Sequence, residues 1–402
     1  MIRMQINTDK IYYLVGSQDV LENAMKTPAL PMFSEVAVEF LSKLSQELIH
    51  DKRVKYYPDV MSYAYWIRKS SLTNAMNHHF DKSNRIGRGV AFHVAPSNVP
   101  VNFAVSMTSS ILAGNVTIVR VSNKEFEQVN IICDAMNRLL KSDFEKLYPY
   151  FGLIRYEHND EITQMLSGIC DVRIIWGGNR TIESIRRAVL PPRSIEMTFA
   201  DRHSIAIIDS EYYLKQDYDK IAKEFYTDTY YTDQNACSSP RLVVWVGKET
   251  MRAREIFWRT LDKLVKSNYN MKPIQAIEKY SSLCALGMKY EGVDLVSNDN
   301  YITRVEVDNL FPELMNYKNS GGYFFEYCAD NLEEIIPVLT KECQTISVLG
   351  IEKADIKDLV FSVGSRGVDR IVTLGQTMGL EFVWDGFKMI EGMSRILYVG
   401  EA

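Results

Sequence analysis

The stretch that decides the fold reads GVAFHVA at residues 89–95, a helix-like segment over residues 99–113, and VTIVRV at residues 116–121. Both apolar runs have the length of a strand and are rich in β-branched residues. Gly114 is placed to end the helix between them. A strand, a helix and a second strand in this order predict a βαβ unit with parallel strands.

The same alternation continues along the chain and extends the prediction to a doubly wound parallel sheet. Such sheets bind ligands beyond the carboxyl ends of their strands. A first amphipathic helix is expected earlier, over residues 34–50. The further strands are expected at residues 151–156, 172–176 and 205–209, and the further helices at residues 127–140, 161–166 and 182–189.

After Asp209 the rhythm changes, and a second α/β domain is predicted. An aromatic-rich helix is expected over residues 212–230, a strand over 242–246 and a helix over 251–266. We therefore expect a first domain at residues 1–209 and a second, catalytic domain at 210–365. Residues 366–402 are expected to return to the first domain or to a subunit interface.

Bulk composition excludes several classes of protein. The 402 residues are 46% hydrophobic and 24% charged, with a formal net charge of −5 and well-mixed signs. This balance argues against binding to nucleic acid or to a membrane surface. The six cysteines lack CxxC spacing, so neither a disulfide framework nor a metal site is expected. The polar start and the absence of an apolar run of ~18 residues predict a cytoplasmic protein without a membrane span.

The chemistry is expected at YTDQNACSSPR, residues 231–241. Cys237 lies there among small and polar residues, just before the apolar strand. A thiol at such a boundary is placed for reaction rather than for packing. We predict that Cys237 is a nucleophile that carries an acyl group.

Three polar segments are candidate partners, and the first two also have a plainer alternative. In PSNVP (96–100), Asn98 is either an oxyanion donor or a helix N-cap. In VRVSNK (119–124), the polar residues hold a ribose or phosphate, or form a solvated strand end. In GGNRT (177–181), a glycine turn opens a helix and suits an anion.

Taken together, PSNVP, AGNVTIVR, GGNRT, QNAC with Arg241, and ECQTISVLG (342–350) resemble the aldehyde dehydrogenase superfamily. DQNACSSPR, QTIS, GVDRI (367–371) and WDG (384–386) resemble, more narrowly, the LuxC family of fatty acyl reductases. The resemblance covers about residues 85–400. It implies an aldehyde-dehydrogenase-like fold, with an NAD(P)-binding domain at residues 1–209, and the reduction of acyl thioesters to aldehydes.

The resemblance also implies residue roles. Cys237 matches the catalytic thiol, and Asn98 matches the side-chain half of the oxyanion hole. Asn123 stands where NAD-preferring members carry a glutamate, and Lys124 adds a positive charge, so NADPH is expected over NADH. The residues expected to bind the cofactor are Arg120, Ser122, Asn123, Lys124, Gly178, Thr181 and Glu342.

One departure from the superfamily concerns water activation. The Glu-Leu-Gly-Gly motif is replaced by EMTFADRHS at residues 196–204, which leaves the role of Glu196 open. Without a water-activating base, the acyl-enzyme is expected to be reduced rather than hydrolysed. His93 and His203 are proton donors or structural histidines, and Cys343 approaches the cofactor or is a core thiol.

The expected function is NADPH-dependent reduction of an acyl thioester, carried by CoA or by a protein, to the aldehyde. Two alternatives stay open: an aldehyde dehydrogenase working in the oxidative direction, or an acyl-transfer scaffold without redox chemistry. By resemblance, a homo-oligomer and an acyl-protein synthetase partner are expected.

Overall fold

The structure is a computed structural model that describes residues 10–80, 83–296 and 299–400. Contacts divide the chain into two compact units: unit 1 comprises residues 1–200 and 380–402, and unit 2 comprises residues 201–379. The expected boundary after Asp209 falls one strand later than the observed one, because β8 (His203–Asp209) belongs to the sheet of unit 2. Among the described residues, no helix has the length and apolar character needed to cross a membrane.

Unit 1 is built around a six-stranded sheet with the order β1-β5-β4-β3-β6-β7. All pairs are parallel except β1 with β5. The strands are β1 (Tyr12–Val15), β3 (Val90–Val94), β4 (Val116–Arg120), β5 (Phe151–Arg155), β6 (Val172–Trp176) and β7 (Ile195–Phe199). The chain builds outward from β3 to β5 and then returns to place β6 on the other side of β3. This reversal is the topological switch point at which such sheets bind ligands.

Helices α5 (Asn102–Ala113), α6 (Glu127–Leu140), α7 (Asp160–Ile169) and α8 (Asn179–Arg186) link the successive strands. Gly114 ends α5 in the left-handed conformation (φ 96°), as the sequence predicts. A side chain there would collide with the Leu30 carbonyl, so glycine is required. The remaining helices of unit 1 are α1 (Gln18–Asn23), α2 (Glu35–His50), α3 (Pro58–Trp66), α4 (Lys69–His79) and α14 (Met389–Met393).

The C-terminal segment belongs to unit 1 from residue 380 onward. It forms a hairpin, β15 (Val383–Trp384) and β16 (Phe387–Lys388), and then β17 (Ser394–Ile396), which pairs antiparallel with β2 (Arg85–Gly87). The Asn115 side chain donates to the Met393 carbonyl (3.0 Å), which fastens α14 near the end of α5. Aromatic contacts fix the hairpin, because Trp384 and Phe387 pack on Trp176 and Phe199.

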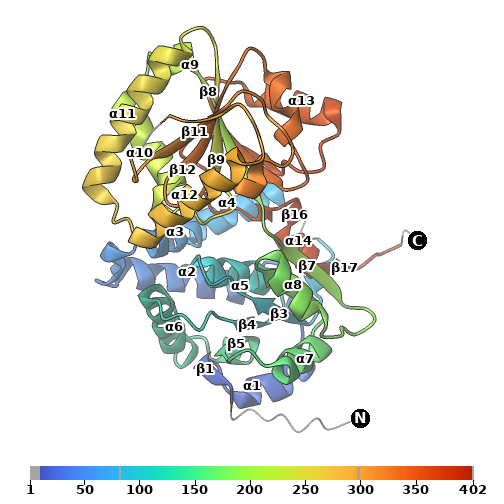
Figure 1. Ribbon diagram of the computed structural model, residues 1–402. Helices are drawn as coiled ribbons and strands as arrows, with labels where there is room; N and C mark the ends of the chain where they lie inside the picture. Colours follow the sequence, from blue (N-terminus) through green and yellow to red (C-terminus); the bar gives the residue numbers. More distant parts are fainter. Residues whose placement is uncertain (1–9, 81–82, 297–298, 401–402) are drawn as a thin grey trace. The chain divides into compact units, whose positions relative to one another are not determined.

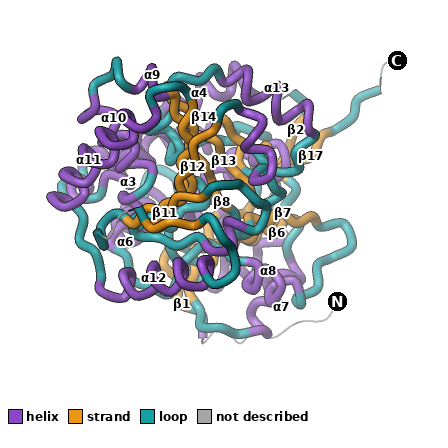
Figure 2. The backbone as a smooth tube through the Cα atoms, turned by 45° about the horizontal axis from the view of Figure 1, so that its top comes forward, coloured by secondary structure: helices purple, strands orange, loops and turns teal. Residues whose placement is uncertain are grey.

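Unit 2 contains a seven-stranded sheet with the order β10-β11-β12-β9-β8-β13-β14, parallel except for β10 (Figures 1 and 2). Its strands besides β8 are β9 (Pro240–Val246), β10 (Val293–Leu295), β11 (Thr303–Val307), β12 (Tyr323–Ala329), β13 (Cys343–Leu349) and β14 (Arg370–Thr373). Its helices are α9 (Ser210–Tyr213), α10 (Tyr218–Asp228), α11 (Thr250–Asn268), α12 (Pro273–Gly287) and α13 (Lys353–Val363).

The central strands of unit 2 bury both faces. Alternate residues of β8 and β9 enter two different cores: Ile207 and Val244 pack on one side, Ile208 and Trp245 on the other. Helices α10 and α11 cover the second face, and α12 and α13 contribute to the first (Figure 1). This fold class, two α/β units with parallel sheets, confirms the prediction from sequence.

A fully buried carboxylate stabilises the face covered by α11. Glu326 on β12 accepts hydrogen bonds from the indole nitrogens of Trp245 (2.8 Å) and Trp258 (2.6 Å). The guanidinium groups of Arg254 and Arg304 also donate to it, each through Nε at 2.9 Å. Every oxygen lone pair that faces the core is therefore used, which is the condition for burying a charge.

We expect Glu326→Gln to lower the free energy of unfolding by about 3–5 kcal/mol, because two guanidinium groups lose their shared buried counter-charge. The midpoint of urea unfolding, followed by tryptophan fluorescence, measures this effect. Glu333→Gln, at an exposed position of the same unit, serves as the control and should change stability by less than ~0.5 kcal/mol. Equal midpoints for the two variants would show that the buried network contributes nothing.

Candidate active site

A pocket of about 510 Å³ opens in unit 1 at the carboxyl ends of β3, β4 and β6. It lies at the switch point of the sheet, where the sequence predicts ligand binding. Three segments far apart in the sequence supply its lining: residues 94–98, residues 120–124 and residues 176–181. Seven predicted site residues are thereby brought together: Asn98, Arg120, Ser122, Asn123, Lys124, Gly178 and Thr181.

Asn98 lies exposed in the loop after β3. The N-cap residue of α5 is Val101 and the first helical residue is Asn102, so Asn98 does not occupy the N-cap position. The structure thus does not support the capping alternative, and the oxyanion role of Asn98 stays a prediction. Two prolines, Pro96 and Pro100, restrict the loop that presents the amide.

The end of β4 is organised by one backbone carbonyl, that of Tyr156. The Arg120 guanidinium lies over the Tyr156 ring, 4.5 Å from its centroid, and donates to the Tyr156 carbonyl (3.3 Å). Asn123 donates its side-chain N–H to the same carbonyl (3.2 Å). These contacts orient both side chains, while Lys124 stays exposed beside them.

The glycine turn before α8 brings backbone close to the pocket. A Cβ on Gly177 would approach Thr181 to 3.1 Å, so a larger residue would crowd this turn. Gly178 is the N-cap residue of α8, and its carbonyl accepts from the Thr181 N–H (2.8 Å). The positive end of the helix dipole therefore borders the same pocket as Arg120 and Lys124.

Cys237 belongs to unit 2 and lies in a turn just before β9, at the amino edge of the parallel sheet. Two non-glycine residues of this turn, Asp233 and Gln234, have positive φ (53° and 58°). Such backbone persists only where surrounding contacts hold it, and it is common at functional sites.

Gln234 supplies those contacts. Its buried amide nitrogen donates to the carbonyls of Pro240 (2.9 Å) and Tyr323 (3.0 Å). Its amide oxygen accepts from the N–H groups of Gly322 (3.0 Å) and Tyr323 (3.1 Å). One side chain thus fastens the Cys237 turn to the starts of β9 and β12.

A second contact fixes the Cys237 backbone directly. The buried Ser204 hydroxyl donates to the Cys237 carbonyl (2.7 Å) and accepts from the Thr345 N–H (3.2 Å). This places Cys237 beside the starts of β8 and β13. Strand β13 lies within the segment ECQTISVLG (342–350). The backbone carbonyl of Glu342, the first residue of that segment, accepts from the His203 N–H (3.0 Å).

Three of the other cysteine thiols are far less accessible than Cys237, whereas Cys328 is partly exposed as well and Cys284 is exposed. Cys133, Cys170 and Cys343 are buried, and burial raises the pKa of each thiol to about 12. Cys237 is partly exposed. Cys343 is therefore a core thiol, which was one of the two alternatives for it.

Two histidines that the sequence offers as proton donors are buried and neutral at pH 7. Burial lowers the pKa of His93 to about 3, and its Nδ1 contacts the Ser106 hydroxyl (2.7 Å). Burial lowers the pKa of His203 to about 4, and nearby Lys318 acts in the same direction. Burial and a neutral ring agree with the structural alternative for both histidines.

Glu196 does not lie at the pocket. It is the second residue of β7 and therefore lies near the amino end of that strand. The pocket lies at the opposite, carboxyl ends of the parallel strands. Its carboxylate accepts from Arg173 Nε (2.8 Å) and Arg186 Nε (2.6 Å). The Glu196 carboxylate is thus engaged by two guanidinium groups and is not among the residues that line the pocket.

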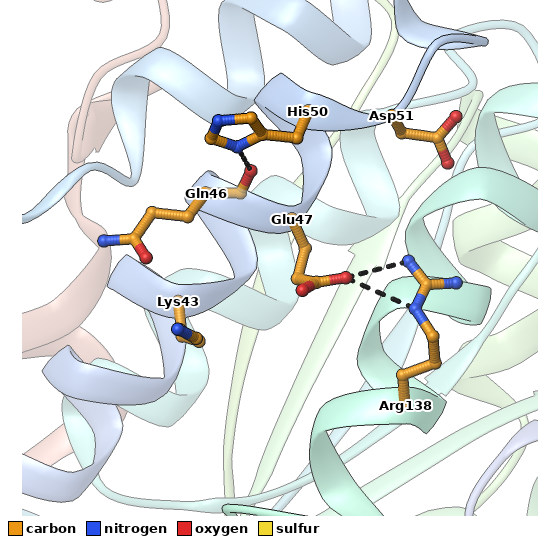
Figure 3. Close-up of a pocket in the computed structure, with 6 residues that line it drawn as sticks. All are labelled: Lys43, Gln46, Glu47, His50, Asp51 and Arg138. Carbon is orange, nitrogen blue, oxygen red and sulfur yellow. Dashed lines mark hydrogen bonds and ion pairs between the residues drawn. The ribbon is translucent and has the colours of Figure 1, made fainter.

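A second hollow of about 380 Å³ lies between α2 and α6 (Figure 3). It is polar, and Glu47 there forms an ion pair with Arg138 (3.0 Å). None of the predicted site residues lines it. Within the described residues, no group of three His, Cys, Asp or Glu side chains is arranged to hold a metal ion.

The fold resembles that of solved aldehyde dehydrogenases. Aldehyde dehydrogenase 21 from Physcomitrella patens superposes with a TM-score of 0.68 at 12% identity, covering 94% of this chain and 89% of that one. Succinic semialdehyde dehydrogenase from Streptococcus pyogenes, in complex with NADP+, superposes with a TM-score of 0.58 at 14% identity, covering 89% and 86%. At these identities the likeness concerns the fold, and it confirms the predicted aldehyde-dehydrogenase-like architecture.

Sequence comparison gives the narrower relationship. The long-chain acyl-protein thioester reductase of Aliivibrio fischeri is 25% identical over 305 residues, which are 72% of this chain and 58% of that protein. This chain thus aligns with a little over half the length of such a relative. The family model described as acyl-CoA reductase (LuxC) matches residues 36–283, a range that contains Asn98, the pocket of unit 1 and Cys237. The chain therefore belongs to the LuxC family of acyl-CoA reductases.

Proposed function

We propose that this protein reduces an acyl thioester to an aldehyde, with Cys237 as the nucleophile that carries the acyl group. The observation that carries the proposal is the Cys237 turn. Gln234 and Ser204 hold its backbone through five hydrogen bonds from their side chains, and the thiol is partly exposed. A held backbone with an accessible thiol suits covalent catalysis.

The donor is an acyl group in thioester linkage. The Aliivibrio fischeri relative is named for acyl groups on a protein, and the family for acyl-CoA. Both donors present the same thioester carbon, so the proposed chemistry is common to them. A long acyl chain is the substrate suggested by the relative's name.

In the proposed reaction, the Cys237 sulfur attacks the thioester carbon, a new C–S bond forms, and the donor thiol leaves. The backbone N–H of Cys237 and the Asn98 side chain are the donors proposed for the oxyanion, following the superfamily resemblance. A bound nicotinamide cofactor would supply the hydride to the carbonyl carbon. The C–S bond to Cys237 then breaks, so that the aldehyde leaves and the Cys237 thiolate is regenerated. Glu196 bonds to two arginines and does not line the pocket, which supports reduction of the acyl-enzyme over its hydrolysis.

The pocket of unit 1 fits the phosphates and ribose of such a cofactor. Its walls combine the start of α8 with Arg120, Ser122, Asn123 and Lys124. Among the residues that the structure describes, no acidic side chain lines it, so a 2′-phosphate would meet Arg120 and Lys124 and no carboxylate. This supports NADPH over NADH, with Glu342 of unit 2 as a further ligand proposed from the resemblance.

The rival functions differ in their products. Oxidation of an aldehyde would use the same thiol but release an acid or an acyl thioester. An acyl-transfer scaffold would load Cys237 and bind no nicotinamide. The remaining proposals, a cytoplasmic homo-oligomer with an acyl-protein synthetase partner, rest on the family resemblance.

Cys237→Ala should lose acylation and aldehyde formation together, by at least ~1000-fold, because the covalent step has no other nucleophile. Intact-mass analysis after incubation with acyl-CoAs of several lengths, with and without NADPH, measures the acyl adduct. Cys284→Ala, an exposed thiol of the same unit, is the matched control and should react normally. Continued reduction of acyl-CoA by Cys237→Ala would show that the nucleophile lies elsewhere.

Lys124→Glu should weaken NADPH binding about tenfold and change NADH binding much less, because the new carboxylate repels the 2′-phosphate. Fluorescence titration of both cofactors measures the two affinities. Lys146→Glu, on the exposed surface of unit 1 outside the pocket lining, makes the same charge change and should alter neither. An equal loss for NADPH and NADH would contradict recognition of the 2′-phosphate by this strand end.

A further inference from the structure

We propose that helix α12 positions the Cys237 turn (residues 233–239), with Lys279 and Ser282 as the positioning residues. The inference rests on the proposed function, because it takes Cys237 as the nucleophile, and it names the side chains that set where the Cys237 backbone lies. Both side chains act through the loop at residues 319–322, whose sequence is NSGG and which is called the NSGG loop below.

Lys279 is a lysine inside the core of unit 2, where only 1% of it is exposed. Its ammonium group donates to the backbone carbonyl of Gly321 (2.7 Å) and to that of Asn300. Lysine is almost never fully buried unless its charge has partners. Here the partners are two carbonyls in the loops that precede β11 and β12, so Lys279 fixes where these two loops lie.

Ser282 provides a second contact from the same helix. It follows Lys279 by three residues and therefore lies on the same side of α12. Its hydroxyl oxygen accepts a hydrogen bond from the side-chain N–H of Asn319 (2.8 Å). The Asn319 side-chain oxygen accepts from the Ser320 N–H (2.7 Å). Helix α12 thus holds the NSGG loop at Asn319 and again at Gly321.

The NSGG loop in turn holds the Cys237 turn through backbone groups. The N–H of Gly321 donates to the Asp233 carbonyl (3.0 Å). The N–H of Gly322 donates to the side-chain oxygen of Gln234 (3.0 Å). Arg241, at the start of β9, donates to the first carbonyl of the loop. The loop is therefore bonded to the turn and to the strand that follows it.

Gly321 is the residue at which the two sets of contacts meet. Its carbonyl accepts from Lys279 and its N–H donates to Asp233, four residues before Cys237. Asp233 has a φ of 53°, a conformation that persists only where surrounding contacts hold it. Loss of the Lys279 ammonium would free Gly321, and the Asp233 backbone could then relax and displace the thiol. A displacement of ~1 Å in a reacting group can slow a reaction about 100-fold.

Amide hydrogen exchange of the full-length chain, read by peptide mass spectrometry, tests the coupling without any substrate. Ser282→Ala should increase exchange in the NSGG loop and in the Cys237 turn about fivefold, because local opening then breaks one hydrogen bond fewer. Ser281→Ala is the matched control. Its hydroxyl donates to the Ile277 carbonyl of its own helix (2.9 Å), so both segments should exchange as in the native chain.

Lys279→Met removes the donor and keeps most of the side-chain length. It should increase exchange in the same two segments at least about tenfold, because two hydrogen bonds are lost. Thermal melting is recorded alongside, and if Lys279→Met does not fold, Ser282→Ala decides. The coupling is overturned if exchange in the Cys237 turn of Ser282→Ala equals that of the native chain, or if Ser281→Ala has the same effect as Ser282→Ala.

Acylation by acyl-CoA then separates a positioning role from a purely structural one. The acylation rate constant at saturating acyl-CoA should fall about fivefold in Ser282→Ala and about 10–100-fold in Lys279→Met. The acyl-CoA concentration at half the maximal rate and the affinity for NADPH should stay at their native values.

Two results would overturn the positioning role: faster exchange with an unchanged acylation rate, or an equal loss of NADPH affinity. A native chain that never becomes acylated would contradict the proposed function instead. Exchange in the Cys237 turn would still decide whether α12 holds that turn.

Discussion

A parallel strand that is buried on both faces can present reactive groups only at its ends. This constraint governs where chemistry is found in both units. The sheet of unit 1 gathers its polar residues at the carboxyl ends of β3, β4 and β6. The sheet of unit 2 gathers Ser204, Cys237 and Glu342 at the amino ends of β8, β9 and β13. Each sheet thus has one polar edge. In unit 1 this edge lies at the carboxyl ends of the strands, where we propose that the phosphates of a cofactor bind. In unit 2 it lies at the amino ends, where the proposed nucleophile is found.

At each edge, buried hydrogen bonds to the backbone set the geometry. In unit 1 a single carbonyl, that of Tyr156, orients Arg120 and Asn123. In unit 2 the buried amide of Gln234 holds two left-handed residues in place before Cys237. Leaving a buried amide unpaired costs ~1–3 kcal/mol for each lost partner, so these contacts fix one arrangement of the turn. The position of the thiol therefore depends on a side chain that bonds to distant backbone groups.

The sequence was sufficient for the pieces whose signals are local. The strands and helices between residues 89 and 176 follow from periodicity and glycine placement. The glycine turn and the end of β4 line one pocket because parallel strands end at the same edge of a sheet.

Local signals were not sufficient elsewhere in the chain. The expected helix over residues 212–230 is broken, because Asp217 caps a new helix by accepting from the Lys220 N–H. Strand β7 is not among the expected strands, although IEMTF alternates apolar and polar residues, because this segment was compared with the Glu-Leu-Gly-Gly motif instead.

Long-range contacts account for the rest. Gln234 stands within the motif that was singled out, yet its partners Gly322 and Tyr323 lie far along the chain, and no local pattern announces them. Arg241 belongs to the segment that carries the resemblance, but its contact with Asn319 forms only in the folded chain.

The unequal burial of the thiols has a consequence for oxidative damage. Cys133, Cys170 and Cys343 lie inside the two cores, where burial keeps them protonated and out of reach of peroxide. Cys237 and Cys328 are partly exposed, and Cys284 is exposed. Oxidation would therefore reach these thiols, the proposed nucleophile among them, while the thiols of the cores stay intact. Peroxide would therefore inactivate the protein before the protein unfolds, and a thiol reductant would restore the proposed activity.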